Sequence, residues 1–362
     1  MHSLLPLMIH IAGVITSFIS RIRIIMKALI AIVLLIGLVS FSNAQTDNPL
    51  YQTARRNMFQ GDFDEATANF TTLLKQEPTN VDFMTDYCYL LNLKKDYPKA
   101  TLLSKEIAAH PKATVESYQV VGIVYKATQA YTDAEQVYRK GIAKYPNSGV
   151  LYNEYGEMFA MQNKFAEAII QWEAGIKADP NYSNNYYNAT MYYSKIKIDL
   201  FWATQYGEIF VNLESYSSHT NTIKAKLAEA YKQLFAGNAL DKLAETPNIS
   251  AFEKAWIQTI GVSSNSLKTS LDVQTLIAAR TKFIIDWYFV KQNEKTPFHL
   301  FDHQQYLVKE GFFEAYNQWL FGEAFDSTAY TQWANTHGRE LGFYKAYQQS
   351  KIYKQPTGEY YH

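Results

Sequence analysis

Small and apolar residues recur along residues 47–215 with a period of about 34. The stretches YGEMFAMQNKFAEAIIQWEAGIKADP (155–180) and VGIVYKATQAYTDAEQVYRKGIAKYP (121–146) carry Gly, Ala, an aromatic residue, Gly and Pro at the same places. An alanine marker, at separations of 34, 34, 34 and 35, consists of Ala66, Ala100, Ala134, Ala168 and Ala203. A proline marker keeps the same phase and consists of Pro78, Pro111, Pro146 and Pro180. Two markers in phase indicate a structural repeat.

Within one period the pattern predicts two helices joined by a turn. In the unit 115–148 the stripe of the first helix is Tyr118, Val121, Gly122 and Tyr125, spaced i, i+3, i+4 and i+7. After a turn at 128–130, one face of the second helix carries Ala134, Tyr138 and Gly141. Gly122 and Ala134 are small where the two helices approach each other. Pro146 ends the second helix because proline has no N–H to continue the hydrogen bonding.

The next unit, 149–182, repeats this arrangement, and both units resemble the tetratricopeptide repeat family. The residues that carry the resemblance are Tyr152, Tyr155, Gly156, Phe159, Ala168, Trp172, Gly175 and Pro180. Units at 47–80, 81–114 and 183–215 match less closely, with Asn57 and Leu91 where the family has Tyr and no closing Pro in the last. The resemblance implies an all-α, right-handed superhelical α-solenoid of about five helix hairpins over 47–215.

The resemblance also implies a binding surface. In this family the first helix of each hairpin lines a concave groove that binds peptide segments or helices of partner proteins. The outward positions of the first helices, our candidate partner contacts, are Arg55, Tyr89, Gln119, Ile123, Lys126, Asn153, Glu157, Met161 and Tyr187. The alternative is that these side chains are only solvated positions on the helices.

The most apolar segment of the chain precedes the repeats. Met26-Lys27, the run ALIAIVLLIGLVSF (28–41) and Ser42-Asn43-Ala44 have the charged, apolar and small-residue parts of a secretory signal peptide. Cleavage after Ala44 would leave a periplasmic or secreted protein that begins at Gln45. Residues 1–25 hold a second apolar run, which a mis-assigned start codon, with Met26 as initiator, explains. An uncleaved membrane anchor is the alternative, and the only membrane contact that we expect.

The charge balance argues against non-specific nucleic-acid binding, and the cysteine content excludes an intramolecular disulfide. Of 34 basic residues, Arg21, Arg23 and Lys27 lie in the first 44 residues, which contain no acid; from Gln45 onward 31 basic face 34 acidic residues, a net charge of −3. This balance lacks the broad positive surface that non-specific nucleic-acid binding needs. Cys88 is the only cysteine, so no intramolecular disulfide forms.

The repeat pattern of about 34 residues is no longer recognisable between residues 216 and 362, although the composition remains typical of helices. Helices are predicted at 222–235, 251–260, 273–290, 300–310, 312–321 and 328–352, with Gly261-Val262-Ser263-Ser264 among the segments that separate them. This C-terminal helical region either caps the solenoid or forms a separate small domain. The aromatic residues that we expect in its core are Trp287, Tyr288, Phe289, Phe312, Phe313, Tyr316, Trp319 and Phe321.

One motif in this region has metal-ligand spacing. His299 and His303 are i, i+4 with Asp302 between them, which differs by one methylene from the H-x-x-E-H pattern of one metallopeptidase class. A third ligand is not identifiable; the alternatives are Glu310, Glu314 and Glu340. A zinc-dependent hydrolase is therefore a second hypothesis.

The leading hypothesis is an exported, non-catalytic scaffold that needs no cofactor and binds a protein or peptide. The chain contains no Gly-rich phosphate loop and no nucleophile elbow. A third hypothesis is a membrane-tethered assembly factor that retains residues 1–44.

Overall fold

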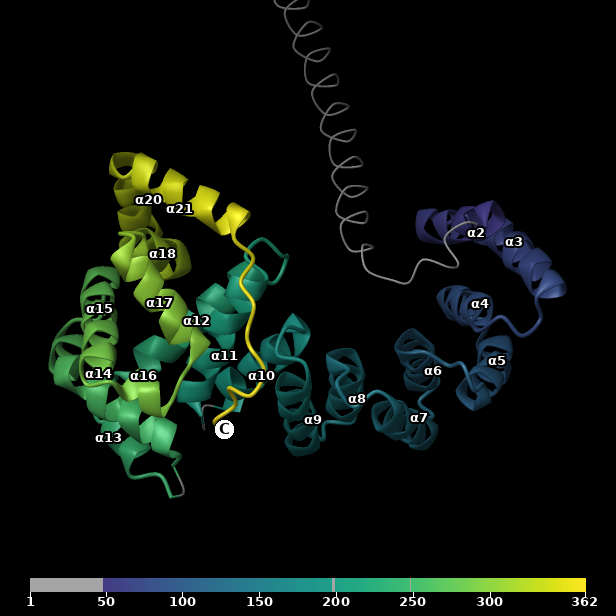
Figure 1. The fold of residues 1–362 in the computed structure, drawn as a ribbon, viewed down its shortest axis with the longest axis horizontal. Coiled ribbons are helices and arrows are strands. Elements are labelled where there is room, and N and C mark those ends of the chain that lie inside the picture. The colour runs from purple at the N-terminus through teal and green to yellow at the C-terminus, as the bar shows by residue number, and fades with distance from the viewer. Residues whose placement is uncertain (1–47, 197–198, 248) are drawn as a thin grey trace, which may run out of the picture. The chain divides into compact units, whose positions relative to one another are not determined.

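The computed structural model describes residues 48–362 apart from 197–198 and 248. The described residues are helical wherever they have regular secondary structure, which confirms the all-α prediction (Figure 1). They form two compact units, one ending at Gln76 and the other spanning Glu77–His362. The predictions of a signal peptide, of cleavage after Ala44 and of a start at Met26 lie outside the described residues.

The described part of the first unit, residues 48–76, is one helix hairpin. Helix α2 (Pro49–Gln60) begins at Asn48, whose side chain accepts hydrogen bonds from the N–H groups of the first turn, and packs against α3 (Phe63–Gln76). The rings of Tyr51 and Phe70 meet edge to face with centroids 6.3 Å apart. The marker Ala66 is fully buried between the two helices.

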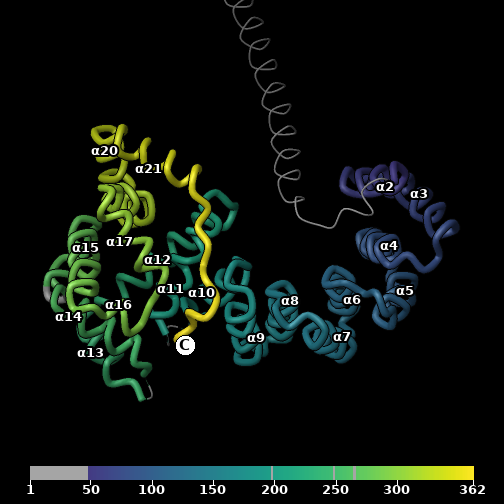
Figure 2. The backbone as a smooth tube through the Cα atoms, in the orientation of Figure 1, coloured from purple at the N-terminus to yellow at the C-terminus, as the bar shows by residue number. Residues whose placement is uncertain are grey.

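The second unit continues the series of hairpins, which confirms the prediction of consecutive helix pairs (Figure 2). The hairpins are α4 (Val81–Leu93) with α5 (Tyr97–Ala109), α6 (Val115–Ala127) with α7 (Tyr131–Lys144), α8 (Gly149–Met161) with α9 (Phe165–Ala178), and α10 (Ser183–Ile196) with α11 (Leu200–Leu213). Each first helix packs on its own second helix and on the first helix of the next hairpin.

Glycine lets the paired helices approach closely at equivalent places in two successive hairpins. A Cβ atom added to Gly122 on α6 would lie 2.2 Å from the Tyr138 ring of α7, and one added to Gly156 on α8 would lie 2.3 Å from the Trp172 indole of α9. Both distances are far below van der Waals contact. The aromatic ring of the second helix therefore occupies the space that a side chain on the first helix would need, as the sequence spacing predicts.

The backbone also repeats with a period of 34 residues. The turn inside each of the first four hairpins contains a residue in the left-handed conformation, with φ between 58° and 87°. These residues are Gly61, Lys95, Gln129 and Asn163. The caps of α4, α6 and α8 show the same period, since Asn80, Thr114 and Ser148 each accept a hydrogen bond from an N–H of the first turn.

The C-terminal region is helical as predicted, with different boundaries. Its elements are α12 (Thr220–Leu234), α13 (Ala239–Ala244), α14 (Ala251–Thr269), α15 (Val273–Phe289), α16 (Gln292–Lys295), α17 (His299–Lys309), α18 (Phe313–Asn317), the π-helical turn η1 (Gln318–Gly322), α19 (Glu323–Phe325), α20 (Ser327–Thr336) and α21 (Gly338–Ser350).

Three predictions for this region are wrong. Helix α14 does not end near residue 260, because the buried Leu267 keeps its last turns packed despite the poor helix formers at 261–264. The predicted helix at 328–352 is two helices, separated at His337, whose φ and ψ of −117° and 31° are not helical. Phe289, expected in the core, is 85% exposed at the last position of α15, whereas Trp287 is fully buried.

A buried ion pair connects this region to the last hairpin. Glu208 on α11 is 1% exposed and receives hydrogen bonds from the Arg280 guanidinium, Gln304 Nε2 and the Tyr316 hydroxyl at 2.9, 2.7 and 2.7 Å. These partners come from α15, α17 and α18. Arg280 also donates to the Tyr231 hydroxyl of α12 at 2.8 Å. The carboxylate thus joins four helices, and Arg280 adds α12 as a fifth. The hydrogen bonds that Glu208 accepts compensate part of its desolvation.

Residues 351–362 form a C-terminal tail that leaves α21 and runs back beside α10 (Figure 1). Two hydrogen bonds join it to the repeats: Gln355 N donates to Asn181 Oδ1 at 3.0 Å, and Asn181 Nδ2 donates to Gln355 O at 2.9 Å. At its end, His362 lies between Glu173 of α9 and Asp199, 2.5 and 3.3 Å from their carboxylate oxygens. The tail therefore contacts residues that belong to two successive hairpins.

Candidate functional site

A large apolar cavity on the repeats lies where α8, α9, α10 and α12 meet. We call it the repeat pocket; its volume is about 610 Å³. Its apolar lining includes Ala160, Met161, Phe165, Trp172, Met191 and Tyr192. A cavity of this size with mostly apolar and aromatic walls is typical of a binding site.

The hairpin geometry positions these side chains. Met161 is the last residue of α8 and Phe165 the first of α9, so the turn through Asn163 places both at the same end of the hairpin. Trp172 reaches the pocket from α9 because Gly156 leaves room for its indole. Met161 is 54% exposed, and its flexible thioether adapts easily to a partner surface.

Charged side chains border the repeat pocket. The Lys195 ammonium lies 4.7 Å from the centroid of the Phe165 ring, which is the geometry of a cation–π contact. Lys226 of α12 lies 3.1 Å from Glu229, and Glu157 of α8 lies 3.2 Å from Lys126. Two lysines, Lys195 and Lys226, and the carboxylate of Glu157 therefore surround the apolar floor of the pocket. Each of them already contacts another side chain of this protein.

A polar ladder on the first helices contains four of the nine predicted partner contacts. Lys126 Nζ donates to Glu154 Oε2 at 2.5 Å and Gln119 Nε2 donates to Glu154 Oε1 at 2.9 Å. Asn153 Nδ2 donates to Glu157 Oε1 at 3.0 Å and accepts from Asn188 Nδ2 at 2.9 Å. These bonds cross from α6 to α8 and from α8 to α10. Asn153 is only 1% exposed, so its amide joins neighbouring repeats and offers almost no surface to a partner.

The other predicted contacts lie at separate places. Met161 lines the repeat pocket, as does Glu157 of the ladder, whereas Tyr89 and Ile123 are half-buried on α4 and α6. The Tyr187 ring packs against Phe210 and His219, with centroids 5.6 and 4.6 Å away. Arg55 belongs to the first unit, where its guanidinium lies over the rings of Tyr51 and Phe59 at 5.7 and 5.9 Å.

Sequence reasoning missed the residues that form most of the repeat pocket. Met191, Tyr192 and Lys195 lie near the end of α10, in the hairpin with the weakest repeat signature. Phe165 opens a second helix, whereas the predicted partner contacts all lie on first helices. The sequence signal that points to them is the apolar pair Met191-Tyr192 beside Tyr193: Tyr193 occupies the buried family position, and its two neighbours are half-buried.

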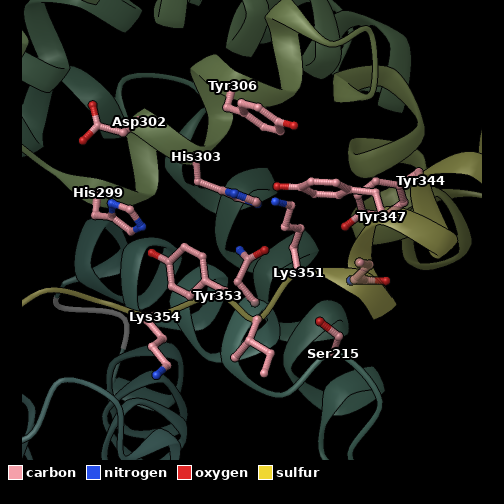
Figure 3. A pocket seen from close by; sticks show the side chains of 13 residues that line it. Ser215, His299, Asp302, His303, Tyr306, Tyr344, Tyr347, Lys351, Tyr353 and Lys354 are labelled. Atoms are coloured by element: carbon pink, nitrogen blue, oxygen red, sulfur yellow. The ribbon is translucent and has the colours of Figure 1, made fainter.

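His299 and His303, the predicted metal ligands, both line a second cavity beside the tail (Figure 3). Asp302 lines the same cavity and accepts a hydrogen bond from the Tyr288 hydroxyl of α15. Burial lowers the pKa of His303 to about 4, so its imidazole is neutral at pH 7. Among the described residues no group of three or more His, Cys, Asp or Glu side chains is arranged to hold a metal ion, so a third ligand is missing. Nor is any helix of the described residues long and apolar enough to span a bilayer.

Comparison with protein families decides what the hairpins are. A model of the tetratricopeptide repeat matches residues 51–114 and 122–183. Residues 51–183 are tetratricopeptide repeats. The family therefore covers the first unit and the hairpins up to the start of α10, and it points to a non-catalytic protein that binds other proteins.

Solved structures of low similarity match part of the chain. A crystal structure of MamA is 18% identical, with a TM-score of 0.38, and the match covers 45% of this chain and 94% of that one. MamA from Desulfovibrio magneticus RS-1 is 14% identical, with coverages of 46% and 92% and a TM-score of 0.36. PilW, described as a type IV pilus biogenesis factor, is 17% identical, with coverages of 59% and 98% and a TM-score of 0.43. A comparison with curated proteins finds no match.

Proposed function

We propose that this protein is an exported tetratricopeptide-repeat scaffold whose repeat pocket receives a large apolar side chain of a protein partner. The observation that carries the proposal is the pocket itself: about 610 Å³, walled by Met, Phe, Trp and Tyr side chains, on repeats whose family binds proteins. Protein interfaces concentrate their binding energy where an aromatic or aliphatic side chain enters such a pocket.

The repeat pocket favours a peptide segment with an apolar anchor over a broad charged surface. Lys195 and Lys226 at its rim suit a carboxylate near the anchor, since neither lysine is buried and both can exchange their present contacts. The side chains of the polar ladder form hydrogen bonds with one another. The ladder therefore fixes the spacing of α6, α8 and α10 and leaves recognition to the pocket.

Site-specific photo-crosslinking in the native cells tests this proposal. A benzoylphenylalanine in place of Met161 is expected to give a defined protein adduct, because this side chain is 54% exposed at the pocket. The matched control is Ile170 on α9, which is 61% exposed and does not line the pocket. Equal adducts from both positions, or none from Met161, would remove the pocket as the binding site.

Export is the second part of the proposal, and it rests on the sequence of residues 26–44 alone. Sequencing the N-terminus of the protein isolated from its own cells is expected to read Gln45 first. A protein that begins at Met1 or Met26 would instead support the membrane-tethered alternative.

A further inference from the structure

A cavity beside the C-terminal tail is not explained by partner binding at the repeat pocket. We call it the tail cavity; its volume is about 330 Å³, and it lies between α17, α21, the end of α11 and tail residues 351–354 (Figure 3). The side chains that the argument uses are His303, Tyr306, Tyr347, Gln348, Lys351 and Tyr353. Small-molecule sites in proteins begin at about this size.

Flat aromatic faces form the walls of the tail cavity. The rings of Tyr306 and Tyr347 are nearly parallel, 26° apart with centroids separated by 5.6 Å, and the His303 ring lies 6.3 Å from Tyr347 at 20°. Tyr353 meets His303 at 5.3 Å from the tail side. Tyr306 is 41% exposed, so part of its surface remains available to a planar guest.

The polar groups of the tail cavity include donors without acceptors. Lys351 and Lys354 form no ion pair with a described residue, and Figure 3 shows the Lys351 ammonium extending toward His303 and Tyr347. Gln348 Nε2 is buried and has no hydrogen-bond partner in the described part of the chain. Asp302, the acid on this cavity's wall, is occupied by the Tyr288 hydroxyl. A buried donor without an acceptor, such as Gln348 Nε2, is unfavourable, and an anionic guest would accept from it. Lys351 and Lys354 are exposed and add positive charge beside it.

We propose that the tail cavity binds a small aromatic anion, with its acid group at Lys351 and its ring against Tyr306 and Tyr347. His303 stays neutral and offers one N–H and one acceptor, because neither of its ring nitrogens is hydrogen-bonded to a described residue. Lys351, Tyr353 and Lys354 belong to the tail, so the guest also bridges the tail to α17. A carboxylate and a phosphate satisfy the same donors.

Calorimetric titration of the full chain tests the proposal with phenyl phosphate and phenylacetate as probes. At least one of the two is expected to bind, and the one that binds identifies the acid group. Benzyl alcohol lacks the charge and is expected to bind at least about tenfold more weakly, the value of one charge-assisted hydrogen bond. Inorganic phosphate lacks the ring and is also expected to bind about tenfold more weakly, because it loses the aromatic contact and the burial of the ring.

Two lysine variants test whether the probe binds in the tail cavity or is attracted by any positive charge on the surface. Lys351→Met keeps the aliphatic stem and is expected to weaken the probe about tenfold. Lys345→Met on α21 removes an exposed charge that does not line the cavity, and it is expected to leave the affinity unchanged. Circular dichroism verifies that both variants are folded, and Tyr306→Leu supplies an independent variant of the aromatic wall. The proposal is overturned if neither probe binds, if both lysine variants bind equally, or if benzyl alcohol binds as tightly as the anions.

Discussion

At the scale of single residues, the ion pair between Glu208 and Arg280 is buried even more deeply than the pair between Lys126 and Glu154. Glu208 and Arg280 are both almost fully buried, and four further polar groups surround them. Removing one member of such a pair leaves an uncompensated charge in the core, which costs more than the intact pair contributes. The pair is therefore a sensitive position for the attachment of the C-terminal helices to α11.

Arg280→Met is expected to lower the free energy of unfolding by about 3–5 kcal/mol, because Glu208 loses its counter-charge inside the core. Urea denaturation measures this change. Lys282→Met on the same helix removes an ion pair with Asp286 at the surface, and its expected cost is about 0.5 kcal/mol or less. Adding Glu208→Gln to Arg280→Met should restore part of the loss. Similar small losses in the two single variants would contradict this account.

Residue types at repeat positions could be predicted, and residue pairs across the chain could not. Gly122, Ala134 and Trp172 have the packing roles that their 34-residue spacing indicates, because that spacing reflects contacts within one hairpin. Glu208 and Arg280 lie 72 positions apart and outside any shared period. Nothing in either local sequence distinguishes them from solvated residues, so only the tertiary structure identifies the pair.

At the scale of helices and turns, the hairpins share a backbone feature that the residue types conceal. The left-handed turn position holds Gly, Lys, Gln and Asn in four successive hairpins. Only glycine adopts this conformation without a steric cost, which is about 1 kcal/mol for other residues. Three hairpins therefore accept local strain in order to keep a tight connection between their helices.

Lys95→Gly is expected to raise the free energy of unfolding by about 0.5–1 kcal/mol, because glycine relieves the strain at φ 59°. Its neighbour Lys94 is a matched control: it is also an exposed lysine, but its φ of −75° is in the right-handed helical region. Lys94→Gly is expected to lower the free energy of unfolding by about 0.5–1 kcal/mol. At this position glycine relieves no strain and only increases the conformational freedom that the unfolded chain loses on folding. Urea midpoints of the two variants should move in opposite directions, and shifts of the same sign would disprove the strain argument.

Helix positions were predictable where periodic packing determines them and less so elsewhere. The turn expected at 128–130 separates α6 from α7 as predicted. In the C-terminal region, burial of Leu267 prolongs α14 through residues with low helix propensity. Periodicity was also a partial guide to the site: Met161 and Glu157 line the repeat pocket, whereas Met191 and Lys195 come from the hairpin with the weakest signature.

At the scale of the whole Glu77–His362 unit, the tail connects residues that are far apart in sequence. It contacts Asn181 near the start of α10, the first N–H of α17 through Glu359, and the Phe252 ring of α14 through Tyr361. His362 lies at its end, between the carboxylates of Glu173 and Asp199. These contacts tie repeat helices and C-terminal helices to one segment, so the charge of His362 affects how firmly they are joined.

This charge predicts how stability depends on pH. Burial opposes protonation of His362, but its hydrogen bonds to Asp199 and Glu173 outweigh burial and raise its pKa to about 9. Because this pKa is higher than the value of about 6.5 in the unfolded chain, protonated His362 increases the free energy of unfolding. This contribution is complete below pH 6.5 and is lost as the pH rises to 9. We expect the wild-type protein to lose on the order of 2 kcal/mol relative to His362→Gln between pH 6 and pH 9.

Urea denaturation of both proteins at the two pH values measures this difference, and the comparison removes contributions that they share. Lys224 is one of these, since burial lowers its pKa to about 8 and it titrates in the same range with the opposite effect on stability. Because the tail has no regular secondary structure, its docking depends on a few side-chain contacts. His362→Gln should therefore show at pH 6 most of the loss that the wild-type protein shows only at pH 9. Parallel pH profiles for the two proteins would mean that His362 is not charged between the two carboxylates.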